Sequence, residues 1–326
     1  MQRSGTAKFT DADDYRTNIR GANVDLVFSS QRNFEASLTW VELRHLRLMR
    51  GEENLPRVAN IALASDLVFI AFPIHHNPPQ IFDGVELQPG NIVFHACAER
   101  VHQWTRGPSK LGLISLAPQH LAAYGKALAG VELVAPPLAR ILRPSRLDAS
   151  RLRSLHAKAC RLAETKPKLL AHPEVSRAIE QELLHTLIKC LTSSEVYAFS
   201  GPKRHHLHVV AQFEEMLSKH SERQLQLPEL CTAIGVSERT LRTCCSEFLG
   251  MSPSRYLRLQ RLNLVREELR RVYTPTSTIS EIARRYGFWE LGRFAGIYQA
   301  MFGEAPSTTL RFARAKLSRR ISAGIA

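Results

Sequence analysis

Arginine and small polar side chains gather on one side of a helix predicted between Ser237 and Gly250. Within this segment Leu241, Cys245 and Phe248 fall at positions i, i+4 and i+7, so these three would face a core. The opposite face carries Glu238, Arg239, Arg242, Thr243 and Ser246. An arginine guanidinium can donate two parallel hydrogen bonds to a guanine edge. This face therefore offers the chemistry of base recognition in duplex DNA.

The segment before this helix is repeated further along the chain. Residues 227–236 read LPELCTAIGV, and residues 279–288 read ISEIARRYGF. A second pair of matching blocks starts at Gly250 and at Gly303, each with Pro three positions later. The offset between copies is 52 residues in the first block and 53 in the second, so copy two has one extra residue near its turn.

Each copy reads as a short helix, a glycine turn and a second helix. Thr278 and Glu281 have the spacing of a capping box, and Ser237 suits the N-cap of the helix that follows it. Gly235 and Gly287 stand where the first helix must end, in a position that commonly needs positive φ. Two such pairs in a basic segment predict two helix-turn-helix motifs, in which the second helix enters the major groove.

The segment 252–272 that joins the copies has no Pro or Gly after Pro253. A continuous helix of that length would measure roughly 30 Å at 1.5 Å per residue, close to the ~34 Å between successive major-groove faces of B-DNA. Six arginines could contact the intervening phosphates: Arg255, Arg258, Arg261, Arg266, Arg270 and Arg271. The alternative for about half of these charges is a solvated helix face, with Glu267 and Glu268 paired to Arg270 and Arg271.

Residues 206–312 resemble the AraC/XylS family of regulators. The resemblance rests on GVSERTLRTCCSEFLGMSPSRYLRLQRLNLVREEL and on ISEIARRYGFWELGRFAGIYQAMFGEAPS. The words GFWELGRF and FGEAPS are similar to the subgroup of ethanolamine-operon activators. The family implies a C-terminal DNA-binding domain, RNA polymerase as a partner, and an N-terminal domain that senses a small-molecule effector or mediates homodimerisation.

The resemblance also implies which residues contact double-stranded DNA. The first recognition helix would use Ser237, Glu238, Arg239, Arg242 and Thr243; the second would use Glu290, Leu291 and Arg293; and Arg258 and Arg261 would hold phosphates. Two positions depart from the family pattern. Gly296 stands where a basic residue is frequent and Trp289 where a small capping residue is frequent, so copy two should grip phosphate less tightly.

Composition agrees with a nucleic-acid partner. The 326 residues hold 44 Lys plus Arg against 30 Asp plus Glu, a net charge of +14. From Lys203 to the end there are 20 basic and 11 acidic residues, a net +9. The six cysteines have no CxxC spacing, so a disulfide framework and a zinc ribbon are both disfavoured. For the vicinal pair Cys244 and Cys245 we expect one buried and one exposed thiol, with a redox sensor as the alternative.

The N-terminal half changes from strand to helix patterns. From about Asp25 to Ala117, short β-rich runs separated by turns predict a small antiparallel barrel or cupin-like jelly roll. From Leu147 to Leu191, apolar residues at helical spacing predict two helices broken near residues 167–173, which either dimerise or pack on the β domain.

The expected fold class is therefore α+β: a β-rich sensor domain with a helical pair, and an all-α domain with two helix-turn-helix motifs. The expected domains are listed by residue: 1–145 sensor; 146–200 helical pair; 206–312 DNA-binding domain, with motifs at 227–248 and 279–302 and a linker helix at 252–272; and 313–326 basic tail.

A β-rich barrel could instead hold a metal, which makes a cupin-type metal-dependent enzyme the alternative function. Its candidate ligands are His75, His76, Glu86 and His102. Adjacent histidines point to opposite faces of a strand and cannot both bind one metal, so we expect no metal, no cofactor and no catalytic residue. Contacts to an effector are assigned to His75, His102 and Trp104. Without an export signal or an apolar membrane segment, a cytoplasmic protein is expected.

Overall fold

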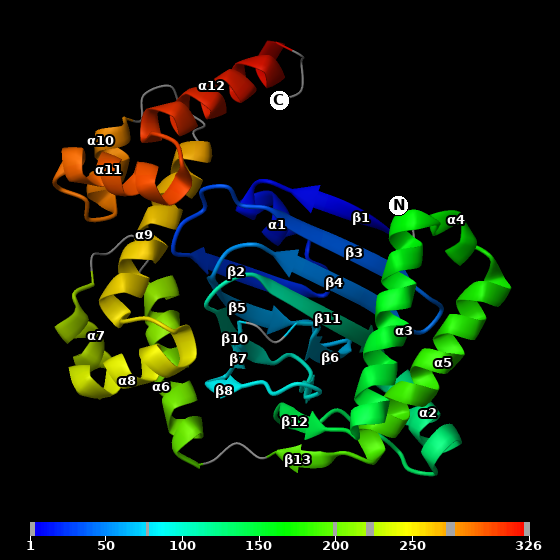
Figure 1. The fold of residues 1–326 in the computed structure, drawn as a ribbon. Coiled ribbons are helices and arrows are strands. Elements are labelled where there is room, and N and C mark those ends of the chain that lie inside the picture. Colours follow the sequence, from blue (N-terminus) through cyan, green and yellow to red (C-terminus); the bar gives the residue numbers. More distant parts are fainter. Residues whose placement is uncertain (1–3, 76–77, 198–200, 220–224, 272–277, 323–326) are drawn as a thin grey trace. The chain divides into compact units, whose positions relative to one another are not determined.

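The computed structural model describes residues 4–75, 78–197, 201–219, 225–271 and 278–322. The chain divides into two compact units, one of residues 1–26 with 34–203 and one of residues 27–33 with 204–326. Figure 1 shows the strands in the first unit and the helices α6 to α12 in the second. Among the described residues, no helix is both long and apolar enough to cross a membrane.

The first unit contains thirteen strands within its described residues. They are β1 (Ser4–Phe9), β2 (Ala22–Phe28), β3 (Ala36–Glu42), β4 (Arg47–Glu53), β5 (Arg57–Leu63), β6 (Val68–Pro73), β7 (Gln80–Phe82), β8 (Val85–Glu86), β9 (Ile92–Phe94), β10 (Arg100–Thr105), β11 (Ser109–Leu116), β12 (Arg140–Arg143) and β13 (Glu195–Tyr197). Its helices are α1 (Ala12–Asn18), α2 (Pro118–Ala129), α3 (Arg146–Thr165), α4 (Pro167–Leu170) and α5 (Pro173–Thr192).

These strands form two antiparallel sheets. In the described residues one sheet has eight strands in the order β1-β3-β4-β11-β6-β9-β12-β13, and the other has five in the order β2-β5-β10-β7-β8. The pairing of β10 with β5 sets Val101 opposite Ile61 and Gln103 opposite Ala59. Because side chains alternate between faces, Val101 and Gln103 share one face of β10, whereas His102 and Trp104 share the other. The prediction of antiparallel β structure is confirmed, but β1 lies before the β-rich stretch and α2 follows it.

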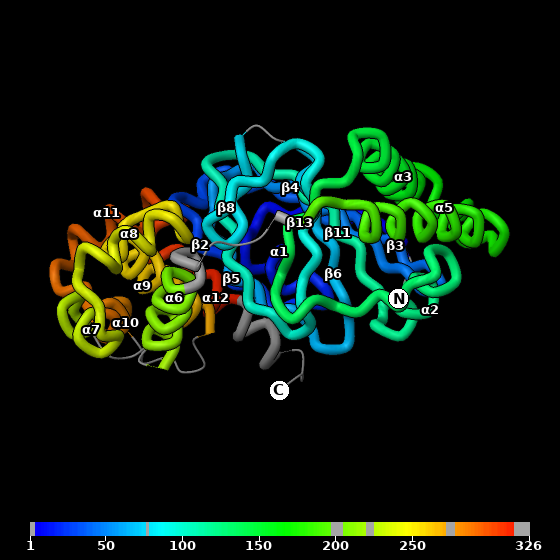
Figure 2. The backbone as a smooth tube through the Cα atoms, turned by 90° about the horizontal axis from the view of Figure 1, so that it is seen from below, coloured from blue at the N-terminus to red at the C-terminus, as the bar shows by residue number. Residues whose placement is uncertain are grey.

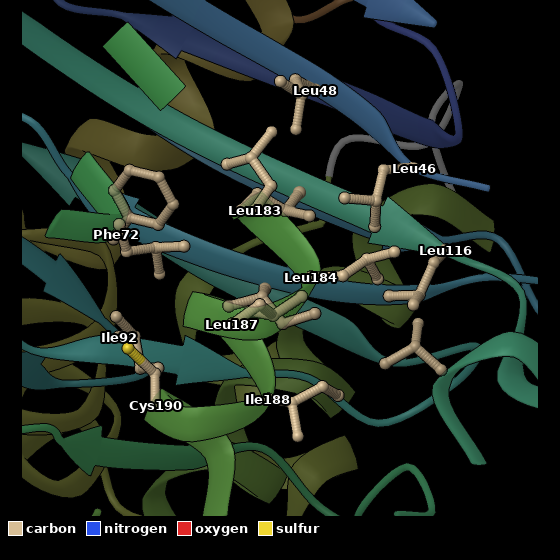
Figure 3. Packing of buried hydrophobic residues seen from close by; sticks show 14 of the residues in the cluster. Leu46, Leu48, Phe72, Ile92, Leu116, Leu183, Leu184, Leu187, Ile188 and Cys190 are labelled. Carbon is tan, nitrogen blue, oxygen red and sulfur yellow. The ribbon is translucent and has the colours of Figure 1, made fainter. Parts of the chain in front are cut away.

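The helices α3 and α5 run beside each other and cover one face of the larger sheet (Figure 2). Figure 3 shows Leu183 of α5 beside Leu48 and Phe72 of the sheet, and Leu184 beside Leu116, all in one buried cluster. Leu183 and Leu187 are fully buried, which the apolar stripe at helical spacing predicted. The helical pair therefore packs on the β structure of its own unit.

A buried histidine joins α3 to strand β4. The side chain of His156 is 0% exposed, and its Nε2 lies 3.1 Å from the carbonyl oxygen of Met49. Burial lowers the pKa of His156 to about 4, because the charged ring would lose its hydration. The native unit therefore contains the neutral ring at pH 7.

This histidine predicts acid sensitivity of the first unit. Its pKa is lower in the folded than in the unfolded chain, so its stabilising effect is present above pH ~6.5 and is lost as the pH falls toward 4. Between pH 7 and pH 4.5 the unfolding free energy should fall by about 2 to 3 kcal/mol more in the wild type than in His156→Gln.

Urea unfolding followed by circular dichroism at the two pH values measures the difference. The exposed His185 of α5 gives the matched control, since His185→Gln should keep the wild-type pH dependence. Equal acid sensitivity in wild type and His156→Gln would contradict this role.

Candidate nucleic-acid interface

The second unit is a set of helices built around one long helix. They are α6 (Gly201–Lys219), α7 (Leu227–Ile234), α8 (Glu238–Leu249), α9 (Pro253–Arg270), α10 (Ile279–Arg285), α11 (Leu291–Phe302) and α12 (Pro306–Ser322). Helix α9 packs against α8 at one side and against α10 and α12 at the other (Figure 1). The pairs α7–α8 and α10–α11 are the two predicted helix-turn-helix motifs, and α9 joins them.

Both motifs turn through a glycine in the left-handed region. The φ angles are +77° at Gly235 and +87° at Gly287, as the sequence predicted. In each turn, the amide of the residue after the glycine donates a hydrogen bond to a carbonyl of the first helix. Val236 N donates to Cys231 O at 3.0 Å, and Phe288 N donates to Ala283 O at 2.9 Å. The same hydrogen bond therefore closes both turns, and a β-carbon at either glycine would be strained.

Helix α8 begins at a well-formed cap. The Ser237 hydroxyl accepts a hydrogen bond from the amide of Thr240 at 3.1 Å, which confirms the predicted N-cap. The capping box of Thr278 with Glu281 at the start of α10 is confirmed as well. At α11 the N-cap residue is Glu290, whose side chain makes no capping hydrogen bond. The extra residue of copy two lies in this turn, as the repeat offset predicted.

The exposed face of α8 is the one that the helical spacing predicted. Leu241, Cys245 and Phe248 are 0% exposed, while Arg239, Arg242 and Thr243 are exposed. A terminal guanidinium nitrogen of Arg242 lies 3.8 Å from a carboxylate oxygen of Glu238. The Thr243 hydroxyl donates to the carbonyl of Arg239 at 3.0 Å. An exposed ion pair at that distance is weak, so the guanidinium of Arg242 remains available to a partner.

The expectation for the vicinal cysteines was wrong. Both Cys244 and Cys245 are fully buried, because the buried face of α8 is wider than the single stripe of Leu241, Cys245 and Phe248. Burial raises the pKa of Cys244 to about 11 and raises that of Cys245 further. A thiol is reactive as the thiolate, so this environment disfavours the redox sensor.

The exposed face of α11 carries fewer long side chains. Glu290 and Arg293 are exposed at its start and 3.8 Å apart, and Leu291 is half-buried. Further along, Gly292 and Gly296 are exposed, and a β-carbon on either would lie in open space. Trp289, just before the helix, is 65% exposed. Copy two therefore offers one cation, one carboxylate and an aromatic ring near the helix start.

The arginines of α9 differ in their surroundings. Arg255, Arg258, Arg270 and Arg271 are exposed. Arg271 pairs with Glu267 as expected, but Glu268 pairs with Arg285 of α10 rather than with a neighbour on its own helix. These charges at the C-terminal end of α9 are thus partly neutralised within the unit.

Two further arginines of α9 have structural partners. Arg261 donates to the carbonyl of Leu225 at 2.8 Å, and burial lowers its pKa. Arg266 is buried with its guanidinium over the ring of Phe302. Arg261 therefore braces the segment before α7, which a sequence pattern could not reveal because the two residues are far apart in the chain.

One further exposed arginine has no role among the residues predicted from the sequence. Arg311 on α12 is the copy-two counterpart of Arg258, 53 residues later, and it is exposed with its guanidinium 5.7 Å from the ring of Phe312. The repeat itself was the signal that could have identified it. Arg258 and Arg311 thus give each motif one exposed cation on the helix that follows its recognition helix.

The residues assigned to an effector do not border the cavity of the first unit. That cavity lies between the sheets and is lined by residues that include Val101 and Gln103 of β10. His102 and Trp104 point to the other face of β10, and the His102 amide donates to the Asp83 carboxylate at 2.8 Å. His75 is exposed after β6. None of the three therefore lines this cavity.

Among the residues that the structure describes, the candidate metal ligands are not brought together as one site. Glu86 is exposed on β8, His75 is exposed, and His102 is buried beside Asp83. His76 lies outside the described residues. Another histidine, His206 of α6, has its Nδ1 2.7 Å from a carboxylate oxygen of Glu247 on α8.

Comparison with known proteins identifies the second unit. A helix-turn-helix domain family model matches residues 230–311. The probable thc operon regulatory protein of Rhodococcus erythropolis is 32% identical over 146 residues, 44% of each chain. The XylDLEGF operon transcriptional activator 2 of Pseudomonas putida is 35% identical over 102 residues, 31% of this chain and 65% of the activator. The chain thus spans less than two thirds of the length of either relative.

A solved structure also resembles part of the chain. It is a probable AraC family transcriptional regulator from Rhodopseudomonas palustris, 34% identical over 32% of this chain and 96% of that one, with a TM-score of 0.30. The two repeated motifs and the family match define a helix-turn-helix domain. The similarity of this part of the chain to the two regulators agrees with the AraC/XylS resemblance of the sequence. The narrower resemblance to ethanolamine-operon activators stays a prediction.

The glycines of α11 predict a gain in stability on substitution. Gly296 lies inside a helix, and a β-carbon there meets no atom within 4 Å. Replacing it by Ala should raise the unfolding free energy of the second unit by about 0.5 to 1 kcal/mol, because the unfolded chain loses conformational freedom. Denaturant unfolding of the full chain in a Trp40→Phe and Trp104→Phe background, followed by the fluorescence of the remaining Trp289, measures the change.

The matched control is Gly235→Ala, in a turn that also has open space but needs a φ of +77°. That variant should lose stability, since alanine in this region is strained. Equal effects of the two substitutions would refute the distinction between the helix position and the turn position.

Proposed function

We propose that this chain is a sequence-specific transcriptional regulator that binds double-stranded DNA through α8 and α11. The observation that carries the proposal is the matched pair of motifs on α9, each with a glycine turn at positive φ and exposed arginine at its recognition helix. The family match and the names of the relatives support it. The enzyme alternative receives no support from them.

The two motifs have different parts in this proposal. On α8, Arg239, Arg242 and Thr243 read base edges, and Ser237 and Glu238 lie at the helix start, where amides face the backbone of the DNA. On α11, Glu290, Leu291 and Arg293 make the second set of contacts. Since copy two has a single arginine on its recognition helix and no side-chain cap, most of the sequence preference rests on copy one.

Phosphate contacts come from the exposed arginines beside the recognition helices. Arg258 and its counterpart Arg311 are exposed in equivalent positions of the two copies. Arg261 is not among the phosphate contacts, because its guanidinium donates a hydrogen bond to the carbonyl of Leu225. Phosphate contacts position the protein on the duplex without reading sequence, so the two groups of arginines should be separable by experiment.

The proposal extends to regulation. The Pseudomonas relatives are named as transcriptional activators, so we infer activation with RNA polymerase as a partner. The first unit has two antiparallel sheets with a cavity between them, where a small-molecule effector would bind. Homodimerisation stays a prediction, since α3 and α5 are used within their own unit to cover the sheet.

The test begins with duplexes selected by the full-length protein from a random pool. Arg242→Ala should weaken binding by about 1 to 3 kcal/mol and relax the preference at one base pair, as loss of a bidentate contact does. Arg258→Ala should weaken binding to all sequences alike and reduce the slope of log affinity against log salt by about one. Gel retardation and reselection measure both effects.

The control is Arg151→Ala, which removes an exposed, ion-paired arginine of α3 in the first unit. It should leave affinity, preference and salt slope unchanged. If no duplex is selected, or if Arg242→Ala lowers affinity uniformly while the base preference stays intact, the assignment of base reading to α8 is wrong.

A further inference from the structure

The cavity of the first unit has walls that are mainly apolar. Its volume is about 80 Å³, several times the 10 to 15 Å³ that one water requires. The apolar part comes from strands of both sheets and includes Leu38, Met49, Ala59, Ile61, Phe82 and Val101. Such walls favour a small ligand with a mostly apolar body.

Charged side chains at the cavity wall are already paired with each other. Arg57 donates from Nε to Glu53 at 2.6 Å and from a terminal nitrogen to the side-chain oxygen of Gln103 at 2.8 Å. Glu53 also accepts from the hydroxyls of Tyr15 and Ser109, at 3.0 and 3.2 Å. The pair has no net charge and its hydrogen-bonding groups are engaged. The network therefore has no free cation for an anionic ligand.

His95 is a polar group at the cavity wall with one ring nitrogen that is not engaged in the Arg57–Glu53 network. Its side chain is buried, 3% exposed, and its Nδ1 lies 3.1 Å from the Glu99 carboxylate. Glu99 also accepts from the amides of Ala96 and Ala139 at 3.2 and 2.8 Å, so this carboxylate acts as an acceptor and Nδ1 as the donor. With Nδ1 as the donor to Glu99, Nε2 is the ring nitrogen that remains for a ligand, and it has no hydrogen-bond partner among the residues that the structure describes.

We propose that this cavity binds a small, uncharged molecule with an apolar body and one hydroxyl or N–H group, which donates a hydrogen bond to Nε2 of His95. A phenol or a small cyclic alcohol has this chemistry. A carboxylate does not, because it would be buried near Glu53 and Glu99 without a free cation to pair with. The regulatory role of this ligand rests on the proposed function, whereas its binding does not.

The test measures binding of phenol to the full-length protein by isothermal titration calorimetry at pH 7.5. Benzoate and toluene are the comparison ligands, the first anionic and the second without a donor. Phenol should bind in a saturable manner, and benzoate should bind at least about tenfold more weakly because its charge must be buried. Benzoate binding as tight as phenol binding would overturn the proposal, as would no measurable phenol binding.

A variant at His95 tests the hydrogen bond itself. His95→Phe keeps a ring of similar size and removes Nε2, so phenol affinity should fall by about 3- to 10-fold while toluene affinity stays within about twofold. The matched control is His102→Phe, which should leave phenol affinity unchanged. His102 is also buried, but it lies on the face of β10 that points away from the cavity. Unchanged phenol affinity in a folded His95→Phe protein contradicts the proposed contact.

A second variant tests the location and covers the case in which His95→Phe does not fold. Ala59→Leu adds volume to the cavity wall and should abolish binding of phenol and toluene alike. Cooperative thermal melting of each variant shows that it is folded. A folded Ala59→Leu protein that still binds phenol with wild-type affinity places the ligand elsewhere.

Gel retardation with a selected duplex, with and without phenol, separates this proposal from the proposed function. If the protein binds phenol but no duplex, the ligand site is supported and the proposed function as a regulator is wrong. If it binds its duplex but no phenol, the proposed function is supported and the ligand site is wrong.

Discussion

Burial of the apolar side of α9 is the constraint on which the DNA-binding unit depends. Tyr256, Leu262, Val265 and Leu269 are at most 1% exposed along this one helix. The hydroxyl of Tyr256 also donates to Glu214 of α6 at 2.6 Å. Because α8 packs against α9 at one side and α10 and α12 at the other, the same buried stripe holds both motifs. The spacing of the recognition helices is therefore fixed by the length of a helix.

The two motifs share a backbone design but differ in their surfaces. Glycines at positive φ close both turns, and glycines at positive φ also end both recognition helices, at Gly250 and Gly303. Copy one adds a serine cap and two exposed arginines, whereas copy two has an uncapped start and two exposed glycines. Affinity for the duplex and preference for its sequence can thus be divided unequally between motifs of the same fold.

Much of this unit could be predicted from the sequence because its signals are local. The cap at Ser237, the turn at Gly235 and the buried stripe through Leu241 each depend on residues within a few positions of one another. The burial of Cys244 and the partner of Arg261 depend on other helices, so spacing within one segment could not reveal them.

The cavity residues were missed for a related reason. Which face of a strand points inward is decided by its register with its neighbours, and β10 turns His102 and Trp104 away from the cavity. The β-rich pattern predicted the antiparallel strands but not the register. His95, whose ring borders the cavity, follows a short strand and has no periodic signal of its own.

If one chain places two recognition helices in neighbouring turns of the major groove, purine-methylation interference on a selected duplex should detect both. We expect two clusters of interfering positions on one face of the DNA, about 10 base pairs apart, with the stronger cluster weakened in Arg242→Ala. A single cluster, or two clusters on opposite faces of the duplex, would contradict it.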